Sequence, residues 1–126
     1  MIVVDSSGWI EIFTGGPRRR DFRDWVDRAD EVLVPTLVLY EVYKVIRRGA
    51  SEDEADAAIA RLRKFTVVSL DEALAVEAAD LSLNHRLAMA DAVVYATAQA
   101  RGAAVITSDS HFEGLPGVEY LDKAGT

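Results

Sequence analysis

Two acidic residues interrupt otherwise apolar helical stretches of this sequence, and they are the first candidates for chemistry. Asp91 lies in the run 86–100, where helical spacing places it on one face with Leu87, Val94 and Tyr95. No Lys or Arg lies one helical turn away, and an unpaired buried charge costs several kcal/mol. We therefore expect a group outside this helix to require the Asp91 carboxylate.

Glu41 interrupts the apolar stretch 37–43 in a similar way. It has cations on its own side of the predicted helix, Lys44 three residues on and Arg48 seven residues on. Two interpretations of Glu41 therefore stay open, a structural ion pair and a ligand.

Two further acids follow predicted strands. Asp5 comes directly after the β-branched run 2–4, and Asp109 follows the apolar run 103–107. Taken alone, Asp5 is equally a turn or cap residue and Asp109 an ordinary loop acid. The carboxyl ends of parallel strands meet at one edge of a sheet, however, and there these acids would lie together.

The periodicity of the chain predicts the elements that position these acids. Strands are expected at 2–4, 31–34, 65–70, 103–107 and 118–121, and helices at 8–14, 18–30, 37–48, 51–64, 72–84 and 86–100. Ser6 or Ser7, Thr36, Ser51 and Asp71 are the expected helix caps. Strands that alternate with helices predict an α/β fold, a parallel sheet covered by helices on both faces. The residues after Asp122 are expected to form a frayed tail.

Composition limits the chemistry further. The 126 residues predict a single domain, 1–126. There is no cysteine, and the two histidines lack any paired metal spacing, so disulfides, a thiol nucleophile and a thiolate zinc site are excluded. We do not expect either histidine to reach the sheet edge as a base. Without an apolar run of membrane-spanning length or a leader-like start, a cytoplasmic location is expected.

Gathering four carboxylates in one place requires positive charge. Two carboxylates about 4 Å apart repel by roughly 4 kcal/mol at an effective dielectric constant of 20. A pocket of four needs bound protons or a multivalent cation, and oxygen ligands suit Mg²⁺ or Mn²⁺. Such an ion binds a phosphodiester oxygen and lowers the pKa of a bound water.

With these residues in view, the chain resembles the PIN-domain ribonucleases over essentially its whole length. Its size and order are similar to those of the toxin half (VapC) of a VapBC toxin–antitoxin pair. The resemblance implies a three-layer α/β/α sandwich with a five-stranded parallel sheet in the order 3-2-1-4-5. The motifs that carry it are Val3-Val4-Asp5-Ser6-Ser7, Glu41, Ala90-Asp91-Ala92 and Thr107-Ser108-Asp109-Ser110-His111-Phe112.

The same resemblance implies a site. The residues it assigns to holding Mg²⁺ or Mn²⁺ and positioning the attacking water are Asp5, Glu41, Asp91 and Asp109. By match, Ser6 and Thr107 would hydrogen-bond the acids or a metal-bound water, although a helix cap and a turn hydroxyl explain them equally well. His111 and Phe112 fit the motif, but core packing or helix capping is the simpler explanation for both.

Partners are also implied by the resemblance. Similar proteins are homodimers that cleave RNA at few sites and are silenced by a cognate VapB-like antitoxin whose C-terminal segment enters the cleft. The net charge of −7 opposes RNA binding, so we hypothesise that Arg18, Arg19 and Arg20 face the cleft and steer RNA. Solvated helix ends are the alternative for this cluster.

Three other functions remain in competition. One is a housekeeping PIN nuclease that processes RNA, and another is a catalytically silent PIN-fold binding module. The third, a phosphoacceptor receiver domain, requires adjacent acids after the first strand and a Lys near the final strand. This sequence has Asp5-Ser6-Ser7 and no Lys beside 105–109, which makes the receiver the weakest of the three.

Overall fold

The computed structural model describes residues 1–123, and a five-stranded parallel sheet runs through its centre. The strands are β1 (Ile2–Val4), β2 (Val32–Pro35), β3 (Thr66–Val68), β4 (Ala104–Thr107) and β5 (Val118–Tyr120). They pair in parallel in the order β3-β2-β1-β4-β5, with Val3 of the central strand opposite Leu33 and Val105. The predicted fold class, sheet and strand order are confirmed.

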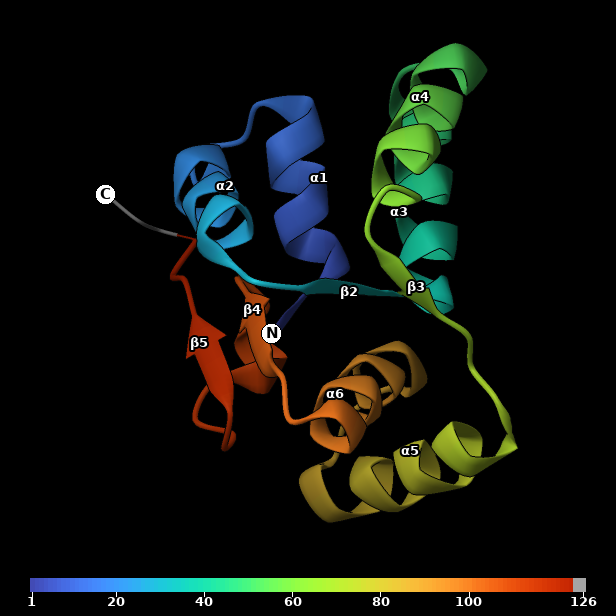
Figure 1. The fold of residues 1–126 in the computed structure, drawn as a ribbon, viewed down its shortest axis with the longest axis vertical. Coiled ribbons are helices and arrows are strands. Elements are labelled where there is room, and N and C mark those ends of the chain that lie inside the picture. Colours follow the sequence, from blue (N-terminus) through green and yellow to red (C-terminus); the bar gives the residue numbers. More distant parts are fainter. Residues whose placement is uncertain (124–126) are drawn as a thin grey trace.

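Helices cover both faces of the sheet (Figure 1). One layer holds α1 (Ser6–Thr14), α2 (Arg19–Arg28), α3 (Thr36–Gly49) and α4 (Glu52–Leu62). The opposite layer holds α5 (Glu72–His85) and α6 (Met89–Arg101), and a short 3-10 helix, η1 (Ser110–Phe112), follows β4. None of the helices in residues 1–123 combines the length and apolar character needed to cross a bilayer.

The core lies on both faces of β1, β2 and β4, whose β-branched and leucine side chains are buried. In α6 every residue from 92 to 98 is buried, because its small side chains let the helix approach the sheet closely. Close approach also explains Gly8 in α1, where a Cβ would lie 2.6 Å from side-chain atoms of Phe22 and Val4. The close packing at Gly8 fixes the start of α1 against the end of β1.

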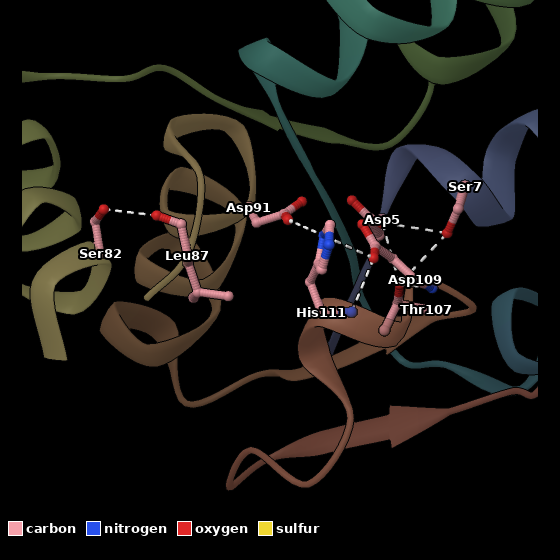
Figure 2. Close-up of polar contacts among 8 residues, drawn as sticks. All are labelled: Asp5, Ser7, Ser82, Leu87, Asp91, Thr107, Asp109 and His111. Atoms are coloured by element: carbon pink, nitrogen blue, oxygen red, sulfur yellow. Dashed lines mark hydrogen bonds and ion pairs between the residues drawn. The ribbon is translucent and has the colours of Figure 1, made fainter. Parts of the chain in front are cut away.

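The predicted helix 86–100 is wrong at its start. The chain leaves α5 at Arg86, which has a left-handed φ of 56°, and α6 begins only at Met89. The corner is closed by the Ser82 hydroxyl, which donates to the Leu87 carbonyl over 2.6 Å (Figure 2). Leu87 is buried within this corner, so apolar periodicity continues through a segment that is not helical. Asp91 is consequently in the first turn of α6.

The helix caps are a second correction. Ser51 and Asp71 accept hydrogen bonds from backbone N–H groups as predicted, whereas Ser6 and Thr36 are the first residues of their helices. Ser6 and Ser7 do not cap α1 because Asp5 occupies the position before it, and Asp5 itself makes no side-chain cap bond. Of the predicted tail, 124–126 lies outside the described residues.

A candidate active site at the carboxyl ends of the central strands

The predicted acids come together at one edge of the sheet. They line an open pocket of about 500 Å³ beyond the carboxyl ends of β1 and β4. Asp5 follows β1, Glu41 comes from α3, Asp91 from the first turn of α6, and Asp109 from the turn after β4. The other residues that line the pocket are Ser6, Ser7, Ile10, Glu11, Pro17 and Lys123.

Asp5 is held by two hydroxyl groups (Figure 2). Its side chain is buried, and Oδ2 accepts hydrogen bonds from Ser7 Oγ and Thr107 Oγ1, each over 3.1 Å. Thr107 Oγ1 also accepts from the Asp109 backbone N–H at 2.9 Å, and Ser7 Oγ accepts from the Ser108 N–H at 3.3 Å. One network therefore fixes both the Asp5 carboxylate and the turn that carries Asp109.

Ser7 is a site residue that the sequence analysis missed. Its neighbour Ser6 matched the motif, yet it is Ser7 that reaches Asp5 and lies 3.4 Å from the Thr107 hydroxyl. Ser6 instead lines the pocket, where its side chain lowers the pKa of Glu41. The position of Ser7 was the available signal. A residue two places after an acid that ends a strand lies in the first turn of the next helix, where its hydroxyl can hydrogen-bond that acid.

Glu41 is half-buried and faces the other acids. Its pKa is raised, chiefly by burial and then by the charges of Asp5 and Asp109, while the Ser6 hydrogen bond opposes the rise. Within residues 1–123 no ion pair joins Glu41 to Lys44 or Arg48. Of the two interpretations left open by the sequence, the structural ion pair is therefore not the observed arrangement.

The position of His111 corrects another expectation. Its Nδ1 lies 3.4 Å from Asp91 Oδ2 and 3.2 Å from Asp109 Oδ1, so this histidine does reach the sheet edge (Figure 2). The side chain is 72% exposed, which rules out core packing. Only its backbone N–H takes part in capping, donating to Asp109 Oδ1 at 2.9 Å. Phe112, by contrast, is fully buried and does pack in the core.

The electrostatics of the pocket show a shortage of positive charge. Burial raises the pKa of Asp91 to about 6, with further contributions from Asp109 and Asp5 and an opposing one from His111. Burial also raises the pKa of Asp5, against the hydrogen bonds from Thr107 and Ser7. Carboxylates that resist ionisation in this way are stabilised by a nearby cation.

The donor set fits a hard divalent ion. Five carboxylates line the pocket, those of the four predicted acids and of Glu11, and ligand atoms of Asp91, Asp109 and His111 all lie within 4.8 Å of one another. That close cluster combines two carboxylates with the His111 imidazole, and the other carboxylates lie outside it. The carboxylate oxygens of the pocket suit Mg²⁺ and Mn²⁺. Lys123 brings a single positive charge to the lining, which is too little to balance five acids.

The arginine cluster 18–20 does not line this pocket. Arg18 is paired with Asp21 at 2.9 Å and donates to the Asp122 carbonyl, while Arg19 donates to the carbonyls of Gly15 and Gly16. Two of the three guanidinium groups are therefore engaged in local contacts, which favours the helix-end interpretation over RNA steering.

Comparison with known proteins relates the chain to one family and several solved structures. The family model of the PIN domain matches residues 2–118. A toxin–antitoxin complex from Klebsiella pneumoniae has a chain with 23% identity and a TM-score of 0.79, covering 94% of this chain and 96% of that one. Mycobacterium tuberculosis VapC20, described as a sarcin-ricin loop cleaving toxin, has 23% identity and a TM-score of 0.80, with 94% and 98% covered.

A third structure is DNA-bound VapBC from Salmonella typhimurium, with 16% identity, a TM-score of 0.75 and 98% and 99% of the two chains covered. No curated protein matches the sequence significantly. At these identities the likeness to the solved structures concerns the fold.

Proposed function

This chain belongs to the PIN-domain family, and we propose that it is a Mg²⁺- or Mn²⁺-dependent endoribonuclease that acts as the toxin of a toxin–antitoxin pair. The observation that carries the proposal is the convergence on one pocket of the four predicted carboxylates, which come from separate parts of the chain, together with that of Glu11. Keeping these acids together there disfavours their charged forms, and metal-assisted hydrolysis supplies a functional reason for the arrangement.

In this proposal the residues that hold the metal are Asp5, Glu41, Asp91 and Asp109. A divalent ion in this pocket supplies charge to a phosphodiester oxygen and lowers the pKa of a water molecule. The hydroxyls of Thr107 and Ser7 fix the orientation of Asp5, and Ser6 favours the charged form of Glu41 by lowering its pKa. His111 keeps Asp91 and Asp109 close by lying between their carboxylates.

The proposed partners follow from those of the similar structures. VapC20 is described as a toxin that cleaves the sarcin-ricin loop, and two other neighbours are toxin–antitoxin assemblies. We propose for this chain an RNA substrate, a VapB-like antitoxin and a homodimer of single PIN domains spanning 1–126. A silent binding module is disfavoured because all four acids face the pocket, and a housekeeping nuclease is distinguished by the experiment below.

The first prediction concerns metal removal. Purified protein incubated with total cellular RNA is expected to give discrete fragments in Mg²⁺ or Mn²⁺ and none after chelation with EDTA, because the acids alone cannot supply the charge that hydrolysis needs. Fragments are read by primer extension. The same fragments in EDTA would contradict the proposal. Growth arrest on expression in cells, relieved by a co-expressed antitoxin, separates a toxin from a housekeeping nuclease.

A further inference from the structure

A second depression lies between α3 and α4, which pack side by side at one end of the molecule (Figure 1). This α3–α4 groove has a volume of about 990 Å³ and is distinct from the acidic pocket. Its polar lining contains more cations than acids: Lys44, Arg47, Arg48 and Arg63 against Glu52 and Asp56. Tyr40 and Tyr43 add two aromatic side chains.

The groove and the acidic pocket share a helix. Glu41 lines the pocket, whereas its neighbours Tyr40 and Lys44 line the groove. Along the axis of α3, Lys44 lies about 4.5 Å and Arg48 about 10.5 Å beyond Glu41, on the same side of the helix. The groove therefore begins within one helical turn of a proposed metal ligand, and its cations continue away from the site.

Most of the groove cations are available to a ligand. Arg47 lies 3.8 Å from Glu52, but Lys44, Arg48 and Arg63 have no carboxylate within ion-pair distance in the described part of the chain. In a chain with a net charge of −7, unpaired cations gathered in one groove mark a surface suited to an anionic ligand.

Tyr40 adds a second recognition element. Its side chain is 59% exposed, and the Lys44 ammonium lies 5.5 Å from its ring centroid and 3.4 Å from its hydroxyl. An exposed aromatic ring beside cations is the combination that binds single-stranded nucleic acid, where bases stack on rings and phosphates contact Lys and Arg. An acidic peptide would use the cations and leave the ring without a role.

We propose that the α3–α4 groove binds the single-stranded RNA that flanks the cleaved bond, with a base on Tyr40 and phosphates on Lys44 and Arg48. The inference rests on the proposed nuclease function and adds to it the path of the substrate. It also explains how an acidic protein with an acidic pocket retains RNA, since the charge that attracts the phosphates lies one helical turn from the site.

The test is binding of a fluorescein-labelled single-stranded RNA of mixed sequence, followed by fluorescence anisotropy in EDTA at several salt concentrations. Lys44→Ala/Arg48→Ala is expected to weaken binding about tenfold and to reduce the slope of log K against log salt by about 1.4, at about 0.7 per lost phosphate contact. Tyr40→Leu is expected to lose about tenfold in affinity, and Tyr40→Phe to retain it, because stacking needs the ring and not the hydroxyl.

The matched control is Arg23→Ala/Arg101→Ala, which makes the same change in net charge at exposed residues of α2 and α6. An equal loss in this control would overturn the proposal by showing a general charge effect. Unchanged RNA affinity in the groove variants would overturn it too. If those variants lose only a poly-glutamate peptide, the groove is a site for an acidic protein segment.

Binding in EDTA does not depend on cleavage, so the two proposals can fail separately. If cleavage depends on metal but the groove variants bind RNA normally, the proposed role of the groove is contradicted and the nuclease proposal stands. If the groove variants lose RNA binding but no cleavage depends on metal, the proposed role of the groove is supported and the nuclease proposal is contradicted.

Discussion

Replacement of Asp91 by Asn is expected to lower metal-dependent RNA cleavage by at least about 100-fold while the fold is retained. The amide keeps the shape of the side chain but removes the charge that faces Asp5 and Asp109 in the pocket. Asp91 is in the first turn of α6, and its side chain is only 14% exposed. The substitution therefore changes the charge of the pocket and leaves the outer surface of the protein unaltered. Initial rates on one RNA substrate at saturating Mn²⁺ measure the loss.

Asp80→Asn is the matched control, since it removes one exposed carboxylate of α5 outside the pocket lining. It should cleave at the rate of the unaltered protein, and circular dichroism should show both variants folded. Cleavage by Asp91→Asn within a few-fold of the Asp80→Asn rate would exclude Asp91 from the site.

The same substitution is expected to stabilise the metal-free protein. Burial raises the folded-state pKa of Asp91 to about 6, above its ordinary value of 3.8, so the folded state binds more protons between these values. The free energy of unfolding therefore falls as pH rises through this window. Near pH 7 Asp91 is ionised in the folded state, and the full loss of stability caused by its charge is reached. At 1.36 kcal/mol per unit, the raised pKa corresponds to about 2 to 3 kcal/mol.

Urea unfolding in EDTA measures this effect. At pH 7 Asp91→Asn should be more stable than the unaltered protein, and the two should converge toward about pH 4, where Asp91 is protonated in the folded state. The pKa values of Asp5 and Glu41 are raised as well, so Asp91→Asn should still lose some stability with rising pH. A variant that is destabilised at pH 7 would show that the Asp91 charge is already compensated within the chain.

The fold was predictable because its signals are local. Short β-branched strands alternate with amphipathic helices, and parallel strands of that kind need helices on both faces. The grouping of Asp5 and Asp109 was predictable for a similar reason, since both follow strands whose carboxyl ends lie at one edge. Asp91 was identified by being a charge in an apolar helix.

What could not be predicted depends on turns. His111 reaches Asp91 only because the chain after β4 turns into η1, a geometry set by the bond from the His111 N–H to Asp109. The break between α5 and α6 at 86–88 was hidden because a left-handed Arg carries no sequence signal comparable to Gly. The α3–α4 groove escaped notice because its cations come from two helices that are separate in sequence.

Titration of Mn²⁺ into metal-free protein, followed by thermal unfolding, tests most directly whether these carboxylates form a divalent-metal site. A ligand that binds only the folded state raises its stability with concentration, so the melting temperature of the unaltered protein should climb as Mn²⁺ is added. Asp91→Asn should start from a higher melting temperature at pH 7 and respond far less. Equal responses of the two proteins, or no response by either, would contradict a metal site in this pocket.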